Sequence, residues 1–276
     1  MRFLVENQTA IRIFFSFGGL LLFWGLALLI PYRSGKELLN KKRLLTNLTL
    51  NFGNGALVAL VVPITLIQIS TSTQLAKFSI FSLPTQNFWV QLTFGVVLLD
   101  LVIYWQHRLT HEIPLLWRMH RVHHSDIEFD TTTAGRFHTL EIFFSFGVKA
   151  FFVVLFGLNA ESIIIFEIIL NFTAMFNHSN FTFPTKIEKT LRYFLITPSL
   201  HRIHHSTHHE EFNRNYGFSV PFWDRIFSSF LNKNKENQKD MLIGLKKFRS
   251  KEEQNFFEYK KQCEYRRFIG SHFLND

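Results

Sequence analysis

Residues 88–124 read FWVQLTFGVVLLDLVIYWQHRLTHEIPLLWRMHRVHH, an apolar run that ends in histidines. The run from Phe88 to Trp105 is interrupted only by Asp100, which is the composition of a helix that crosses a membrane. Two histidine clusters follow directly, within residues 107–111 and 120–124. Because imidazole is a common ligand of transition metals, the stretch indicates a metal site at the end of a transmembrane helix.

Four other stretches are apolar enough to span a membrane. They are Ile11–Ile30, Asn51–Ser70, Leu140–Leu158 and Glu161–Phe176. The first is long enough, at about 1.5 Å per residue, for a hydrocarbon core of about 30 Å, and it lacks a cleavage site of small residues, so we expect it to be retained. Gly157, Leu158 and Asn159 indicate a tight hairpin between the last two stretches. The sequence predicts an all-α integral membrane protein with about four to five transmembrane helices and a cytoplasmic helical domain.

The basic residues predict which side of the membrane carries the histidines. Residues 31–46 contain Arg33, Lys36, Lys41, Lys42 and Arg43, whereas residues 71–87 contain only Lys77. Because basic loops stay in the cytoplasm, residues 106–139 and the chain after Asn177 are expected there too, and a re-entrant 140–176 hairpin would leave this unchanged. The net charge of +9 then reflects membrane sidedness, and we expect no nucleic-acid partner. A bacterial chain of this kind would lie in the inner membrane.

The sequence divides into three regions. Residues 1–87 form an N-terminal transmembrane region, residues 88–231 a histidine-bearing domain that includes the transmembrane hairpin, and residues 232–276 a charged, solvated cytoplasmic tail. The single cysteine, Cys263, excludes an internal disulfide and a thiolate metal cage. Within the second region, the apolar spacing predicts a helix that ends at Thr197-Pro198.

A second amphipathic stretch begins at Pro221. One face collects the apolar side chains of residues 222–231, and the other carries Asp224, Arg225, Ser228 and Ser229. Such a helix either lies in the membrane interface or packs on the core of its own domain.

Three histidine clusters share spacings of three or four residues. They are His107 and His111; His120, His123 and His124; and His201, His204 and His205. On a helix this spacing puts two imidazoles on one face, where both can bind one ion at about 2.0–2.1 Å. Because these eight side chains exceed the six positions of one octahedral ion, we expect two metals about 4 Å apart. His178 is a ninth expected ligand, His138 is either a ligand or a supporting residue, and His208 and His209 are expected to be solvated.

Four other side chains are candidates for supporting the metal ligands. Asp100 lies inside a predicted span, where an acid is costly, and shares a helical face with Tyr104, His107 and His111. It lies about 10 Å from His107 along the helix, so we expect it to pair with Tyr104 or with another span. Glu141 and Asp224 are candidates for orienting histidines. Lys149 and Glu167 could pair across the hairpin or extend separately towards water.

With these clusters, residues 100–230 resemble the membrane-bound fatty acid hydroxylase and sterol desaturase superfamily. Further matching motifs are Tyr104-Trp105, Thr131-Thr132-Thr133, Arg136-Phe137-His138, His178-Ser179-Asn180, Thr197-Pro198, Asn215-Tyr216-Gly217 and Trp223-Asp224. The last two are similar to those of bacterial members and of alkylglycerol monooxygenase. Thr139 departs from the proline that many relatives have, which weakens the assignment of His138.

The resemblance implies a catalytic domain with two iron ions that activate O2 and hydroxylate or desaturate a C–H bond of a lipid, such as a fatty acyl chain, a sterol or an ether lipid. Zinc could occupy the same ligands but is redox-inert. No Gly-x-Gly-x-x-Gly loop or haem-binding segment is present, so a separate electron donor of the ferredoxin or cytochrome b5 type is expected. Two alternatives are a histidine-rich membrane protein that binds or transports metal, and a degenerate family member that serves as a lipid-binding scaffold.

Overall fold

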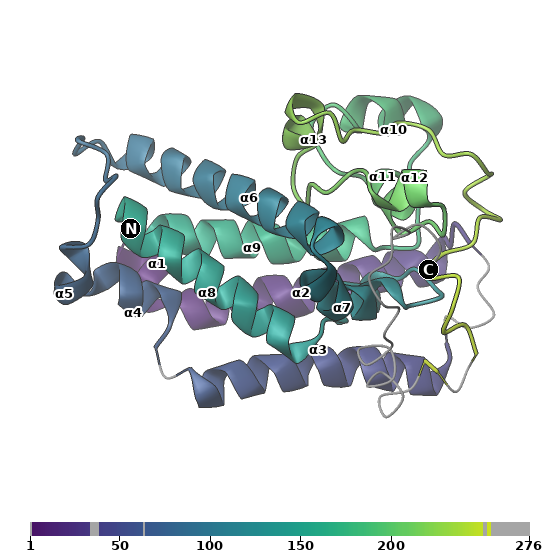
Figure 1. Cartoon of the computed structure of the whole chain (residues 1–276), viewed down its shortest axis with the longest axis horizontal. Helices are drawn as coiled ribbons and strands as arrows, with labels where there is room; N and C mark the ends of the chain where they lie inside the picture. Colours follow the sequence, from purple (N-terminus) through teal and green to yellow (C-terminus); the bar gives the residue numbers. More distant parts are fainter. Residues whose placement is uncertain (1, 34–38, 63, 251–252, 255–276) are drawn as a thin grey trace.

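The computed structural model describes residues 2–33, 39–62, 64–250 and 253–254. Every regular element in this part of the chain is helical, apart from an isolated β-bridge between Ser206 and Ile243. Five helical segments are long and apolar enough to cross a membrane, and they extend along the long axis of the molecule (Figure 1). They are α2 (Gln8–Leu29), α3 (Lys41–Val61) with α4 (Leu66–Thr71), α6 (Phe88–Glu112), α8 (Thr139–Phe156) and α9 (Ala160–Asn177). The all-α, multi-pass membrane architecture predicted from the sequence is confirmed.

Capping residues set the ends of these helices. The side chain of Asn87 accepts two backbone hydrogen bonds at the start of α6, and α6 ends where Pro114 opens α7 (Pro114–His124). Gly157 ends α8 with a φ of 59°, a left-handed conformation that glycine adopts readily, and Asn159 caps α9. The hairpin predicted at residues 157–159 is therefore confirmed.

The second span begins earlier than predicted. α3 starts at Lys41, where Asn40 caps it, so Lys41, Lys42 and Arg43 lie in the helix and not in the preceding loop. Its first turns are polar because they face the histidine-bearing domain: Arg43 and Asn47 are buried there. Lys36 lies outside the described residues.

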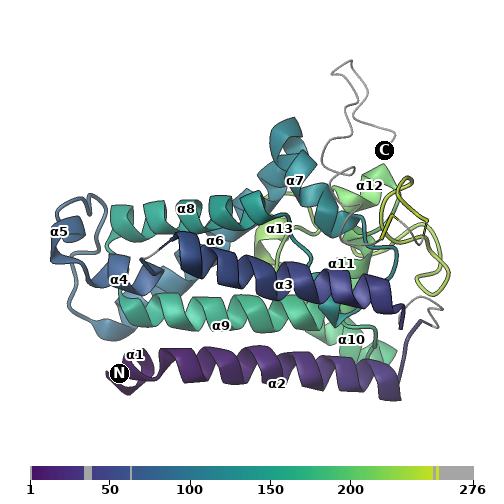
Figure 2. The ribbon, with the colours of Figure 1, turned by 90° about the horizontal axis from the view of Figure 1, so that it is seen from below.

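α9 is the central helix of the bundle. It contacts α2, α4, α6 and the short α1 (Arg2–Glu6), and α2 and α9 lie side by side in both views (Figures 1 and 2). Gly95 allows α6 to approach α9 closely, because a Cβ atom there would lie 2.4 Å from Oγ of Ser162. The buried side chains of Leu99, Ile163 and Ile164 fill the space beside this contact. The packing brings the ends of α6 and α9, which carry histidines, to the same end of the bundle.

Charged side chains within the spans pair with one another. Glu167 on α9 lies 3.3 Å from Nζ of Lys149 on α8, and its other oxygen pairs with the guanidinium of Arg12 on α2. Pairing across the hairpin was one of the two predicted alternatives, and Arg12 is an additional partner. Because an unpaired charge is costly in hydrocarbon, this cluster ties three spans together.

Short helices follow the last span and gather at one end of the bundle (Figure 1). They are α10 (Thr185–Leu191), α11 (Pro198–His204), α12 (His209–Phe212) and α13 (Phe222–Ile226); the remaining short elements are α5 (Thr73–Ala76) and the 3₁₀ helix η1 (Thr131–Gly135). The helix predicted to end at Thr197-Pro198 ends instead at Leu191, and Thr197 caps α11.

Two expectations for the C-terminal part were wrong. The helix after Pro221 has only five residues. Asp224 and Ser229 were expected on its polar face, but both are buried. Their side chains bond to each other, and Asp224 also bonds to the preceding loop. The chain after residue 232 is not simply solvated: Met241 and Ile243 pack with Phe129 in a small buried cluster. Residues 255–276, with Cys263, lie outside the described part.

Candidate metal centre

Nine buried histidines converge in two groups. The first contains His107, His111, His120, His124 and His204, and the second contains His123, His178, His201 and His205. Within each group, one nitrogen from every ring lies within 4.8 Å of the others. α6, α7 and α11 supply eight of these residues at or next to their ends, and His178 follows the last residue of α9. The structure thus brings together all eight histidines of the sequence clusters and His178.

Adjacent histidines contribute to different groups because of helical geometry. His123 and His124 point about 100° apart on α7, and they belong to the second and first group, respectively. His204 and His205 divide in the same way at the end of α11. The rings of His124 and His205 nevertheless stack, with centroids 4.4 Å apart, so the two groups lie next to each other.

The second group has the spacing of a coordination sphere. Nε2 of His178 lies 3.1 Å from Nε2 of His123, 3.1 Å from that of His201 and 3.2 Å from that of His205. One ring nitrogen carries at most one hydrogen, so it cannot make three such hydrogen bonds. Nitrogens bound to one metal at about 2.1 Å lie about 3.0 Å apart at right angles and about 3.4 Å apart in a tetrahedron. The nitrogen positions fit a shared cation.

The first group leaves its inward nitrogens without partners. Nε2 of His107, His120, His124 and His204 and both ring nitrogens of His111 are buried without a hydrogen bond in the described part of the chain. Buried polar atoms are normally paired, so this set of orphaned nitrogens indicates a ligand at their centre. Opposite ligands of an octahedral ion lie about 4.2 Å apart, within the spread of this group.

The outward nitrogens of several rings are held by oxygen atoms. Nδ1 of His107 lies 2.6 Å from the carbonyl oxygen of Tyr216, and Nδ1 of His204 lies 2.8 Å from that of Arg214. Nδ1 of His120 lies 2.6 Å from Oε1 of Glu141. Because these oxygens only accept, they hold the proton on Nδ1 and turn the lone pair of Nε2 inward, as metal ligation requires.

Burial keeps six imidazoles of the two groups neutral. Desolvation lowers the pKa of His178 to about 4 and that of His204 to about 3. It also lowers the pKa values of His123, His124, His201 and His205 well below the ordinary value, and neighbouring imidazoles lower them further. Neutral imidazole is the form that binds metal, so the electrostatics and the geometry agree.

Asp224 supports the site through a loop. Its carboxylate accepts hydrogen bonds from the backbone N–H groups of Tyr216 and Gly217, at 2.8 and 2.9 Å, and from the hydroxyl of Ser229. These bonds fix the peptide whose carbonyl faces His107. Asp224 therefore positions the backbone acceptor and does not itself touch a ring of either group.

The other candidate residues lie farther from the two groups. Asp100 accepts a hydrogen bond from Nε1 of Trp223 on α13, and the hydroxyl of Tyr104 lies 2.7 Å from that of Ser229, so both connect α6 to the C-terminal segment. The partner predicted for Asp100, Tyr104 or another span, was therefore wrong, because the short helix α13 packs against α6 and supplies the donor. His138 caps α8 by accepting from the N–H of Leu140 and belongs to neither group. His208 and His209 also lie outside both groups.

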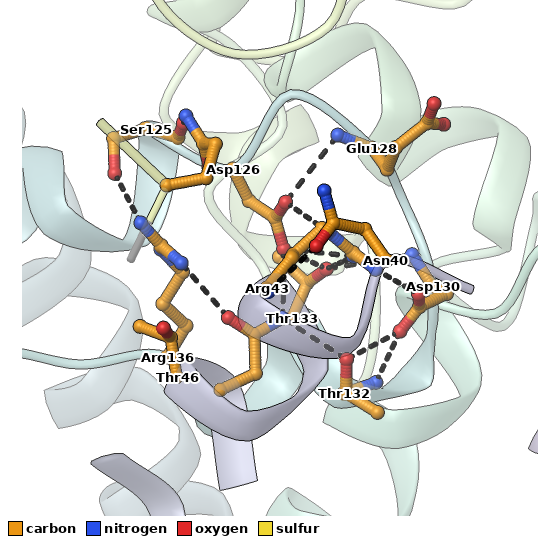
Figure 3. Close-up of polar contacts among 12 residues, drawn as sticks. Asn40, Arg43, Thr46, Ser125, Asp126, Glu128, Asp130, Thr132, Thr133 and Arg136 are labelled. Atoms are coloured by element: carbon orange, nitrogen blue, oxygen red, sulfur yellow. Dashed lines mark hydrogen bonds and ion pairs between the residues drawn. The ribbon is translucent and has the colours of Figure 1, made fainter. Parts of the chain in front are cut away.

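A buried ionic network joins α3 to the segment that follows α7, next to His123 and His124 (Figure 3). Arg43 on α3 donates to Asp126 at 2.5 and 2.9 Å and to Asp130 at 2.6 Å. Arg136 donates to the side chain of Asn47 and to the carbonyl of Val122. Asp126 follows His123 and His124 closely, so the network anchors the end of α7 against α3. Hydropathy reasoning missed this role of Arg43, because it counted the residue as a loop charge.

A cavity of about 640 Å³ opens beside the first group. His111 is part of its wall, together with the aromatic side chains of Trp117, Phe212 and Tyr216. Arg108 and Arg214 also line it. The cavity therefore reaches a ring of the candidate metal site.

Comparison with known proteins identifies the part of the chain that carries this site. The sequence profile of the fatty acid hydroxylase family matches residues 92–229, which include all nine histidines of the two groups. No solved structure matches the chain at a significant level.

Curated relatives match about half of the chain. An ornithine lipid hydroxylase of Rhizobium tropici is 31% identical over 153 residues, covering 55% of this chain and 45% of the relative. The alkylglycerol monooxygenase of Homo sapiens is 29% identical over 169 residues, or 61% of this chain and 36% of the relative. A very-long-chain aldehyde decarbonylase of Oryza sativa subsp. indica is 30% identical over 142 residues, 47% and 22% of the two chains. The chain thus spans less than half the length of these relatives.

Proposed function

The chain belongs to the fatty acid hydroxylase family, and from this we propose that it is a membrane oxidoreductase that uses two iron ions and O2 to hydroxylate a C–H bond of a lipid. Desaturation of such a bond is the near alternative within the same chemistry. The observation that carries the proposal is the convergence of nine buried histidines in two adjacent groups at the ends of apolar helices. The names of the relatives are those of lipid-modifying enzymes, so the comparisons do not favour metal transport.

Each histidine group would hold one iron ion. His107, His111, His120, His124 and His204 would bind the first, and His123, His178, His201 and His205 the second. Bound iron would supply the redox chemistry with O2 that an unactivated C–H bond requires, which zinc in the same ligands could not. The unpaired inward nitrogens and the spacing of about 3 Å around His178 support this assignment.

The protein's own groups would keep these ligands in the required state. Glu141 and the carbonyls of Tyr216 and Arg214 would hold protons on the outward nitrogens, so that the inward nitrogens stay free to bind metal. Burial would disfavour protonation of the imidazoles of His178 and His204. The cavity at His111 would admit the reacting part of the lipid or O2.

The membrane placement supports a lipid substrate. The basic residues of the segment after α2 favour a site on the cytoplasmic side, in the inner membrane if the cell is bacterial. The reaction also needs two electrons that the metals alone do not supply, so a separate ferredoxin or cytochrome b5-type donor would act on this side.

Lipid analysis tests the proposal directly. A host that expresses the chain, grown under O2, should contain a lipid heavier by one oxygen, and 18O2 should label it; a lipid lighter by two hydrogens would identify a desaturase. His204→Ala and His123→Ala should abolish the product while the protein remains in the membrane. His208→Ala, which lies outside both groups and outside the wall of the cavity at His111, is the matched control and should retain it. An unchanged lipid profile in the presence of iron, O2 and reductant would contradict the proposal.

A further inference from the structure

A second cavity lies among the spans, away from the opening at His111. It has a volume of about 290 Å³ and is lined by residues of α2, α3, η1 and α9. η1 contacts α2, α3 and α9, so it closes one side of the cavity between these helices. Gly135 allows η1 to lie against α3, because a Cβ atom there would be 2.5 Å from side-chain atoms of Asn51.

Three polar side chains in the wall of this cavity lack hydrogen-bond partners. The hydroxyl of Thr131 is buried, with the residue 1% exposed, and makes no hydrogen bond in the described part of the chain. Asn51 and Asn171 lie on α3 and α9, and neither side-chain amide bonds to another described residue. Asn171 precedes the end of α9 by about 9 Å along the helix axis. Unlike Thr131, both asparagine side chains are exposed, so the cavity is open at Asn51 and Asn171. Polar groups at such positions are costly in hydrocarbon unless a ligand pairs with them.

The remaining wall is uncharged and largely apolar. Phe17 on α2 and Phe52 on α3 stack with ring centroids 5.8 Å apart, each about half exposed, and bridge the two helices beside the cavity. Among the residues that the structure describes, none with an acidic or basic side chain lines the cavity. A charged headgroup would therefore find no partner, whereas an ester, amide or hydroxyl group would find donors and acceptors beside an aromatic surface.

The cavity also adjoins the second histidine group. Ala174 contributes to its wall, and the carbonyl of Ala174 lies 2.7 Å from Nδ1 of His178. One layer of backbone therefore separates the cavity from a ring of that group.

We propose that this cavity binds a bilayer lipid through an uncharged ester, amide or hydroxyl group, which hydrogen-bonds to Asn51, Thr131 and Asn171. The hydrocarbon chain lies along Phe17 and Phe52, where the cavity meets the membrane. That this lipid is the substrate rests on the proposed function; the binding site itself rests on the cavity and its unpaired polar groups.

Photo-cross-linking tests the site without measuring activity. The probe is a monooleoylglycerol analogue with a diazirine near its ester, added to the purified chain in phosphatidylcholine nanodiscs, and peptide mass spectrometry locates the label. We expect labelling of peptides that carry residues 51, 131 or 171, which unlabelled 1-monooleoylglycerol competes away. Asn51→Leu with Asn171→Leu should reduce it at least fivefold, and the smaller change Thr131→Val should also reduce it.

Two controls separate hydrogen bonding from simple partitioning. Thr49→Val, on the same helix as Asn51 but outside the cavity wall, should label like the wild type. A diazirine derivative of hexadecane, which has no hydrogen-bonding group, should label wild type and variants alike. Equal labelling of wild type and Thr131→Val by the glycerol probe, with unchanged melting temperatures, would overturn the proposal. Cross-linking without any lipid product would instead count against the proposed reaction and leave the binding site standing.

Discussion

Replacement of Arg43 by methionine should strongly destabilise the protein. Arg43 is fully buried and pairs with the carboxylates of Asp126 and Asp130, which are also buried (Figure 3). Methionine has a similar length but no charge, so both acids would lose their main counter-charge. Removal of one partner from a buried ion pair typically costs about 3–5 kcal/mol.

The pKa of Asp126 gives an independent value for the contribution of this network to the free energy of unfolding. Burial alone would raise this pKa, but the charges of Arg43 and Arg136 outweigh burial and lower it to about 2. The difference between this folded-state pKa of about 2 and an unfolded-state pKa near 3.9 corresponds to roughly 2.5 kcal/mol of stability. This contribution is present above about pH 4 and is lost as the pH falls towards 2. This contribution of roughly 2.5 kcal/mol is of the same order as the cost of breaking the ion pair.

Thermal unfolding followed by tryptophan fluorescence in nanodiscs measures the effect. At about 2–4 °C per kcal/mol, Arg43→Met should lower Tm by roughly 6–20 °C at pH 7. Lys42→Met, which removes an exposed charge from the neighbouring position of the same helix, is the control and should shift Tm by less than about 2 °C. A double variant with Asp126→Asn should be less unstable than the sum of the single variants. If Arg43→Met melts within 2 °C of the control, the assigned role of this network is wrong.

Three further substitutions address the candidate metal site. Glu141→Gln removes the carboxylate that faces His120 and should weaken metal retention against a chelator by about 10–100-fold. The control is Glu112→Gln, which changes an exposed ion pair and should not weaken retention. Equal metal retention by the two variants would exclude the assigned role of Glu141. Asp224→Asn replaces one carboxylate oxygen by an NH2 group, which cannot accept a hydrogen bond from the backbone N–H of Tyr216 or Gly217. The metal content measured by mass spectrometry should therefore fall; full metal content would contradict the positioning role of Asp224. His138→Ala should retain the wild-type metal content and lose about 0.5–2 kcal/mol of stability as a helix cap; loss of metal would instead make His138 a ligand.

Hydropathy predicted the spans well where the helices face lipid. It failed at the start of α3, because Arg43 and Asn47 are polar yet face protein, and a window of apolar residues cannot detect that environment. The same limitation placed Asp224 on the polar face of an amphipathic helix. A regular amphipathic pattern assumes a long helix, whereas α13 is short and the loop before it folds back onto Asp224.

The histidine groups were predictable because helical spacing determines which rings share a face. The split of His123 and His124 between two groups follows from the angle between successive residues on a helix. The oxygen atoms that accept hydrogen bonds from the outward nitrogens of His107 and His204 were less predictable. Tyr216 and Arg214 contribute backbone carbonyls, and every residue type carries that group, so only the tertiary fold selects them.

The metal content of the purified chain tests the central claim most directly. Protein from iron-supplemented cells, analysed by inductively coupled plasma mass spectrometry together with quantitative amino-acid analysis, should contain about two ions per chain. His111→Ala in the first group and His201→Ala in the second should each reduce that content selectively, to about one ion per chain. A wild-type content below about 1.5 ions per chain, or variants that keep the full content, would contradict a centre of two metals held by these histidines.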